Sequence, residues 1–411
     1  MTVDFVARSL ELDGALRALR RDLHQIPEQG LSLPLTQQRL LQELEGLPIE
    51  VTLGESLSSI TAVIRGTAGE KAGATATPTP APAVLLRSDM DALPVVEETG
   101  LDFVNPDATN MHACGHDLHM TMLVGALKLL AEHRDELAGD VVCVFQPGEE
   151  GFDGAQHMLD EGLLEITGAK PVAAYALHVF SSHIESGRFL VRQGAIMSAS
   201  DTVRMVVRGH GGHGSAPHQA IDPITASAAM VSALQTMVTR RFDAFDPVVL
   251  SFGMFRGGST ENVIPESVEM LATVRTFSEK NRELMRSEVV KVLEGVADAH
   301  SVTIDIDYEM LYPVTKNDAD EADFVAGTVA ELFGDESLER PKQPLSASED
   351  FSKMLEHVPG VFIPLGATPE GVDLETGPYN HAAGAQFDEA VLTRGAALLA
   401  TLAARRLNPP A

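Results

Sequence analysis

Apolar runs alternate with helical patterns through the first part of the chain. Short apolar runs bounded by turn residues predict buried strands at 61–64, 83–86, 141–145 and 173–177. Between the second and third of these runs, apolar residues recur at spacings of three and four after Asp117, which predicts a helix with one buried face. The alternation indicates an α/β fold with a central mixed sheet flanked by helices.

A second pattern begins near Asp201. It predicts strands and helices in the order β-α-β-β-α-β, the ferredoxin-like order, at 203–207, 223–240, 248–254, 268–274, 283–296 and 302–306. Asp222 precedes Pro223, a pair typical of a helix start. Because the α/β pattern then resumes, we expect a discontinuous domain of residues 1–198 and 310–411, with an α+β domain of residues 199–309 inserted in it.

Composition limits the classes of partner. The chain has 30 Lys and Arg against 59 Asp and Glu, a formal charge of -29, so it should repel nucleic acid and anionic membranes. The first residues do not resemble a secretion signal, and no apolar run is long enough to span a membrane. The two cysteines fit a reducing compartment, with Cys143 in a core strand, and we expect a cytoplasmic protein. The proline-rich segment 68–82 predicts a surface loop.

The segment 111–119 concentrates metal-binding side chains. Three histidines, a cysteine and an aspartate fall within nine positions: His112, Cys114, His116, Asp117 and His119. Burying these groups without partners would cost several kcal/mol, whereas thiolate and imidazole together are typical ligands of divalent metals. The segment therefore predicts a metal site.

Further donors follow the predicted strands. Glu149 and Glu150 come after the third strand, His178 ends the next, and Asp91 follows an earlier one. All should meet at the carboxyl edge of the sheet. Adjacent side chains should point apart, so one glutamate would bind metal while the other carries a proton. For Asp91 the sequence leaves open a helix cap, an ion pair or the orientation of a ligand histidine.

Two more histidines lie in turn-rich segments. His381 precedes the last predicted helix, and His213 lies in the glycine-rich run 209–218, which lacks phosphate-loop spacing. Taken alone, both also fit solvent-facing surface histidines.

Taken together, the motifs resemble the M20 metallopeptidase family, in particular its amidohydrolase branch of aminoacylases, hippurate hydrolases and auxin-conjugate hydrolases. The resemblance covers nearly the whole chain, in the family's order: 87–94, 111–119, 145–150, 212–213, 262–265 and 348–351. Asn380 stands where the family more often has Leu or Met, which affects the shape of the pocket.

The resemblance implies a set of roles. Five ligands would hold two divalent ions: Cys114, His116, Glu150, His178 and His381. Glu149 would be the general base, and Asp91 would assist catalysis. The inserted domain would be a lid and dimerisation domain whose His213 reaches the partner's active site. Asn262 and Arg275 would help to hold a substrate carboxylate.

The function that follows is metal-dependent hydrolysis of the amide bond of N-acyl amino acids by a homodimer. Glu149 would act as base on a water held by the ions, which would be zinc or manganese, with cobalt or nickel also compatible. A dipeptidase or carboxypeptidase of the same family is the alternative. A non-catalytic metal-binding protein and a cysteine hydrolase with Cys114 as nucleophile are further alternatives.

Overall fold

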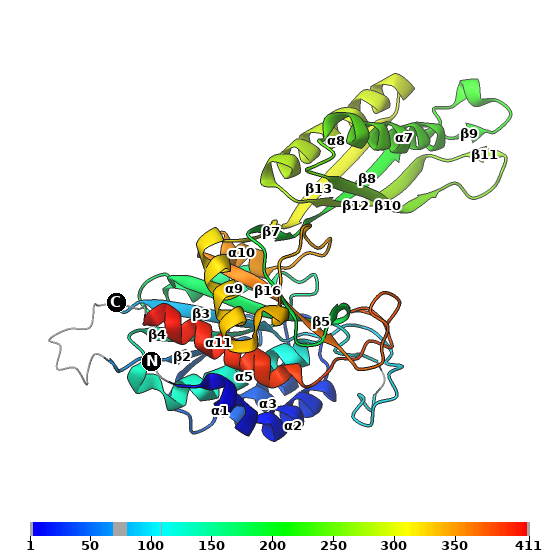
Figure 1. Cartoon of the computed structure of the whole chain (residues 1–411). Coiled ribbons are helices and arrows are strands. Elements are labelled where there is room, and N and C mark those ends of the chain that lie inside the picture. The colour runs from blue at the N-terminus through cyan, green and yellow to red at the C-terminus, as the bar shows by residue number, and fades with distance from the viewer. Residues whose placement is uncertain (1–2, 69–79, 108, 409–411) are drawn as a thin grey trace. The chain divides into compact units, whose positions relative to one another are not determined.

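The computed structural model describes residues 3–68, 80–107 and 109–408 (Figure 1). The chain divides into two compact units. The first unit comprises Met1–Gly194, Lys316–Lys342 and Lys353–Ala411, and the second comprises Ala195–Thr315 and Gln343–Ser352. Most of the loop predicted at 68–82 lies outside the described residues.

An eight-stranded mixed sheet forms the centre of the first unit, in the order β1-β2-β4-β3-β5-β16-β6-β15. The strands are β1 (Glu50–Leu53), β2 (Ile60–Ile64), β3 (Ala83–Asp89), β4 (Asp140–Gln146), β5 (Ala173–Glu185), β6 (Phe189–Leu190), β15 (Leu338–Glu339) and β16 (Gly360–Thr368). The four central strands, β4, β3, β5 and β16, are parallel. Their carboxyl ends therefore share one edge, where donors from separate segments meet.

Helices cover the sheet of the first unit. They are α1 (Phe5–Glu11), α2 (Asp13–His24), α3 (Pro34–Leu44), α5 (His116–Glu132), α6 (Gly154–Asp160), α9 (Ala319–Phe333) and α11 (Val391–Leu407). The short helix α10 (Phe351–Leu355) begins in the last two residues of the second unit and ends in the first. In Figure 1, α5 and α11 lie side by side, and both contact β3 and β5. Because α1 and α2 in turn cover α5, that helix is buried on nearly all sides. Short 3-10 turns lie at Arg134–Glu136, Leu163–Glu165 and Asp335–Ser337.

The second unit is a four-stranded antiparallel sheet with two helices. Its elements run β8 (Ala199–Arg208), α7 (Pro223–Arg241), β10 (Val248–Gly257), β12 (Ser267–Thr276), α8 (Glu279–His300) and β13 (Thr303–Tyr312). The strand order β10-β12-β8-β13 is ferredoxin-like. Alternating residues of β8 and β12 turn their apolar side chains toward the two helices. A two-stranded ribbon, β9 (Gly212–His213) with β11 (Val263–Ile264), extends from this unit, and a 3-10 turn lies at Pro217–Gln219.

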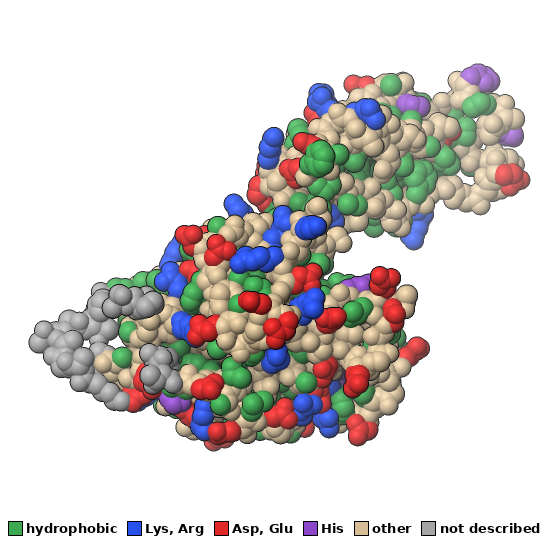
Figure 2. Space-filling view, viewed as in Figure 1, with side chains coloured by type: hydrophobic (Ala, Val, Ile, Leu, Met, Phe, Trp, Pro, Cys, Tyr) green, Lys and Arg blue, Asp and Glu red, His purple; other side chains and the backbone are tan. Residues whose placement is uncertain are grey.

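Short segments connect the units at β7 (Gly194–Met197) and β14 (Thr315–Asn317). None of the helices among the described residues is both long and apolar enough to cross a membrane. On the face shown in Figure 2, acidic and basic side chains are interspersed rather than gathered by sign. The net charge of -29 therefore does not gather into a single acidic patch on that face.

The predicted fold class is confirmed, and most element bounds agree to within a few residues. The structure adds strand β1 and extends the second helix of the β-α-β-β-α-β segment to Glu279–His300. That helix begins earlier than predicted because the Ser278 side chain accepts the backbone N–H of Asn281, an N-cap that periodicity alone does not show. Cys143 is fully buried in β4, as expected for a core cysteine.

Candidate metal centre and active site

The turn before α5 places Cys114 and His116. Gly115 joins them at φ +81°, and a Cβ there would come within 2.3 Å of the Val179 side chain. Only glycine fits this left-handed position without a clash. The turn therefore brings the side chains on either side of Gly115 into one buried space, where Cys114 is 7% and His116 is 0% exposed.

Two more histidines approach the Cys114 sulfur. Nε2 of His178 lies 3.4 Å and Nε2 of His381 lies 3.2 Å from Sγ. Nδ1 of His178 donates to the Val179 carbonyl at 2.9 Å, so its Nε2 lone pair faces the sulfur. Burial holds the pKa of His178 well below its ordinary value, which keeps the ring neutral and able to bind a metal.

Asp91 fixes the turn that carries the two glutamates. Its Oδ1 accepts the backbone N–H of Glu149 at 3.0 Å, and its Oδ2 accepts that of Glu150 at 3.1 Å. This turn presents both carboxylates to one side, each with an oxygen within 4.8 Å of a His116 nitrogen. The expectation that adjacent glutamates point apart is therefore wrong, because they lie on a turn and not on a strand.

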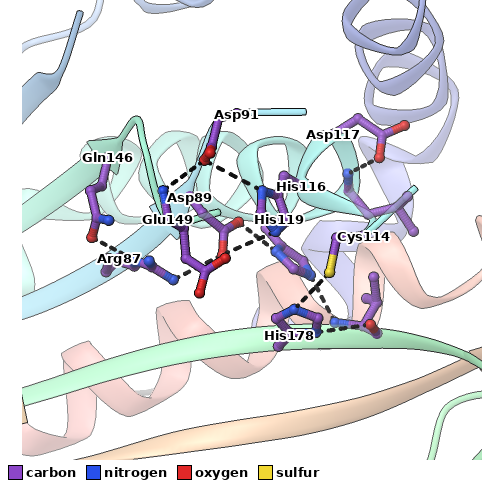
Figure 3. Close-up of polar contacts among 12 residues, drawn as sticks. Arg87, Asp89, Asp91, Cys114, His116, Asp117, His119, Gln146, Glu149 and His178 are labelled. Atoms are coloured by element: carbon purple, nitrogen blue, oxygen red, sulfur yellow. Dashed lines mark hydrogen bonds and ion pairs between the residues drawn. The ribbon is translucent and has the colours of Figure 1, made fainter. Parts of the chain in front are cut away.

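His119 is oriented by a hydrogen-bonded network at the end of β3. Its Nδ1 donates to Asp89 at 2.6 Å, and its Nε2 accepts the backbone N–H of Val179 at 2.7 Å. Arg87 bonds both Asp89, at 2.9 Å, and Gln146, at 3.0 Å (Figure 3). Because both nitrogens of His119 are engaged, this ring supports the site and has no lone pair left for a metal.

The acidic groups around His116 favour a cation at this position. Burial opposes protonation, yet Asp89, Asp91 and Cys114 raise the pKa of His116 well above its ordinary value. At the rim, hydrogen bonds to Cys114 and Glu150 raise the pKa of His381 to about 10. Protons on these two imidazoles balance the charge of the neighbouring carboxylates, a role that a metal ion would fill more fully.

The donors fit divalent metal ions. Among the described residues, neither ring nitrogen of the fully buried His116 has a hydrogen-bond partner. Two groups of donors share the Cys114 sulfur, each with its atoms within 4.8 Å of one another: Cys114, His116 and His178, and Cys114, Glu150 and His381. Three ligands per ion leave positions open for water or substrate, as catalytic metal sites require.

Three of the predicted site residues belong to the second unit. His213 lies on the β9–β11 ribbon, paired with Val263, and Asn262 accepts the N–H of the neighbouring Gly214 at 2.8 Å. Arg275 lies near the carboxyl end of β12, eight residues after Ser267, where that strand begins, so the ribbon and Arg275 are about 26 Å apart along the strand. The structure thus brings His213 and Asn262 together and places Arg275 at the other end of the sheet.

Comparison with known proteins decides the family. The model of peptidase family M20/M25/M40 matches residues 85–405. The chain belongs to this family. It is 34% identical to thermostable carboxypeptidase 1 of Saccharolobus solfataricus, covering 97% of each chain. It is 33% identical to a hippurate hydrolase of Campylobacter jejuni, covering 99% of this chain and 100% of that one.

The structural comparison agrees. A dinuclear metal-binding M20 peptidase of Bacillus subtilis superposes with a TM-score of 0.81 at 28% identity, over 97% of this chain and 99% of that one. The predicted family is confirmed, and this M20 chain is a metal-binding hydrolase of amide bonds.

Some residues that hold the start of α5 beside His116 were not predicted from the sequence. His24 of α2 contacts Asp117 through Nδ1 at 2.8 Å and Glu97 through Nε2 at 3.2 Å, and Arg20 pairs with the same Asp117 at 2.9 Å. Asp117 is fully buried beside His116, so this network holds the start of α5. Its members are distant in sequence from the 111–119 motif, and only the buried charge of Asp117 indicated that partners must exist.

Proposed function

We propose that this M20 enzyme hydrolyses the amide bond of N-acyl amino acids with two divalent ions per subunit. The observation that carries the proposal is the pair of donor groups that share Cys114. One ion would be held by Cys114, His116 and His178, and the other by Cys114, Glu150 and His381. Zinc or manganese suits this mixture of thiolate, imidazole and carboxylate, and cobalt or nickel is also compatible.

Glu149 is the general base in this proposal. The residue is 7% exposed, and its backbone is held by Asp91. When bound, the metal ions polarise the amide carbonyl and make a water molecule more acidic. Glu149 takes a proton from the attacking water as the new C–O bond forms, and then passes this proton to the nitrogen as the amide C–N bond breaks.

His213 is proposed to stabilise the developing oxyanion. Its Nδ1 accepts the backbone N–H of Ser215 at 3.1 Å and faces the Ser215 hydroxyl at 2.8 Å. In the neutral ring the proton therefore sits on Nε2, on an exposed side chain that can donate to a substrate oxygen. One such donor typically contributes about 3 kcal/mol to the transition state.

The active form is proposed to be a homodimer in which the second unit acts as lid and dimerisation domain. An N-acyl amino acid is much shorter than the distance of about 26 Å between the ribbon and Arg275. One protomer therefore cannot bring His213, Asn262 and Arg275 to the same small substrate. We propose that Arg275 holds the substrate carboxylate, while His213 and Asn262 come from the partner subunit.

Carboxypeptidase action is a second candidate, favoured by the likeness to thermostable carboxypeptidase 1. Both reactions cut an amide next to a free carboxylate, so the acyl group decides between them. We further propose that the enzyme acts in the cytoplasm on small-molecule substrates, without nucleic-acid or membrane partners, in line with its charge of -29.

The test combines metal analysis with substrate profiling. Purified protein should carry divalent metal and hydrolyse N-acetyl, N-benzoyl, N-succinyl or indole-acetyl amino acids faster than dipeptides. Glu149→Gln should keep the metal and lose about a hundredfold or more in kcat. Chelation should abolish activity until metal returns, whereas activity that survives complete metal removal would instead favour Cys114 as a nucleophile. Faster cleavage of dipeptides would instead identify the enzyme as a peptidase of the same family.

A further inference from the structure

One amide side chain joins all three segments that meet at the Cys114 sulfur. Nδ2 of Asn380 donates to the Val179 carbonyl at 2.9 Å and to the Cys114 carbonyl at 3.4 Å. It also lies 3.7 Å from Sγ of Cys114, within the range of an N–H···S hydrogen bond. Asn380 immediately precedes His381, and Val179 immediately follows His178.

The opposite end of the amide is equally constrained. Oδ1 of Asn380 accepts the backbone N–H of Ser181 at 2.9 Å and the Ser181 hydroxyl at 3.1 Å. A flipped amide would point its NH₂ group at a backbone N–H and its oxygen at two carbonyls. The network therefore fixes Nδ2 as the atom that faces the sulfur.

The backbone beside Asn380 is strained. His381 adopts φ +73°, a left-handed conformation unusual for a residue with a side chain, and its N–H donates to the Ala113 carbonyl at 2.9 Å. This conformation brings Nε2 of His381 to 3.2 Å from the sulfur. The hydrogen bonds of Asn380 hold the preceding residue and so help to keep His381 in this position.

We propose that Asn380 is a positioning residue that holds the Cys114, His178 and His381 segments and donates a hydrogen bond to the Cys114 thiolate. The inference rests on the proposed metal centre. An N–H···S bond stabilises negative charge on sulfur, so it lowers the electron density that the thiolate gives to a bound ion. Such residues around the ligands commonly change metal affinity by about 10- to 100-fold.

The experiment replaces the native metal with Co²⁺, whose bond to a thiolate gives a charge-transfer band in the near ultraviolet. Asn380→Leu removes the donor and keeps a side chain branched at Cγ, and Asn380→Ser is the smaller variant in case the larger Leu prevents folding. Ser181→Ala is the matched control, because it removes one partner of Oδ1 and leaves Nδ2 facing the sulfur.

We expect both Asn380 variants to bind Co²⁺ about 10- to 100-fold more weakly, because the three ligand segments are no longer held together. The band should also move to lower energy, because the thiolate loses its hydrogen bond, while Ser181→Ala keeps the wild-type band. If Asn380 only supported the loop structure, its replacement would lower the stability of the protein and leave the energy of the band unchanged. Unchanged band energy and affinity in a folded Asn380 variant would overturn the inference. Absence of the band in the wild type would instead overturn the proposed metal centre.

Discussion

Asp91 accepts the backbone N–H of Glu149 at 3.0 Å across the edge between β3 and β4. The carboxylate thus positions the proposed general base through its backbone. Asp91→Ala should free this turn and lower kcat by about 10- to 100-fold, the usual range for residues that orient a metal site. Steady-state kinetics on the preferred substrate measure the effect.

Asp91→Asn separates geometry from charge. An asparagine can accept only one of the two N–H groups, so it should fall between wild type and Asp91→Ala. Asp160→Ala, which removes an exposed aspartate of the same unit, should leave kcat unchanged. Equal rates for Asp91→Ala and wild type would show that the turn holds without this carboxylate.

His119 should be needed for stability and not for metal binding. Replacement by Phe leaves the Val179 N–H and the Asp89 carboxylate without their partner in a buried space, at a cost of about 1–3 kcal/mol for each unsatisfied group. Denaturant unfolding should show this loss, while metal content stays at the wild-type value. Cys114→Ser is the reference that should lose metal, and loss of one ion from the His119 variant would make His119 a ligand.

The sequence predicted those parts of the site whose residues lie close together in the chain. Cys114, His116 and His119 lie within six residues, and their crowding indicated a metal. The same crowding did not distinguish His119 from its neighbours. What distinguishes it is a backbone N–H from β5, a contact made only after the sheet has formed.

The positions of the strands were predicted from apolar runs, because strands of the parallel centre are buried on both faces. The hydrophobic pattern did not predict the directions of Glu149 and Glu150. Strand alternation predicts opposite directions for Glu149 and Glu150, but the turn after β4, held by Asp91, turns both toward His116. The hydrophobic pattern cannot predict a turn whose geometry depends on Asp91, a carboxylate distant in sequence.

His24 should give the protein a pH-dependent stability. Burial opposes its charge, but Asp117 and Glu97 raise the pKa of His24 above the usual 6.5. Because the folded state binds this proton more tightly than the unfolded state, the stabilisation is complete below about pH 6.5 and is lost as pH rises through the folded pKa. Arg20 also faces this group and favours its neutral form. The ring of His112 packs against His24, and burial lowers the pKa of His112 to about 3, so it carries no charge in this pH range.

The measurement compares free energies of unfolding of wild type and His24→Gln from pH 5 to 9. The difference should be largest at the acidic end and shrink with rising pH, by at most about 1.4 kcal/mol per pH unit. Taking the difference between the two proteins cancels the titration of the metal ligands. A difference that grew with pH would mean that His24 is neutral in the folded protein.

The last prediction concerns the origin of His213. If it acts on the partner's substrate, a hybrid dimer of Glu149→Gln and His213→Ala chains contains one complete site, with Glu149 from one chain and His213 from the other. Hybrids purified through two different tags should therefore have about half of the wild-type activity per dimer, because one of two equivalent sites is restored. Both parent homodimers should be at least about a hundredfold less active than wild type.

A hybrid of Glu149→Gln with wild-type chains is the control, since it keeps one complete site under either arrangement. If His213 served its own protomer, each chain of the double-mutant hybrid would lack one essential group, and the hybrid would be as inactive as its parents. Because Arg275 lies at the other end of the same sheet, an Arg275→Ala chain paired with Glu149→Gln should behave differently. If Arg275 acts within its own protomer, that hybrid has one site without the base and one without the guanidinium, and KM should rise at the site that keeps Glu149.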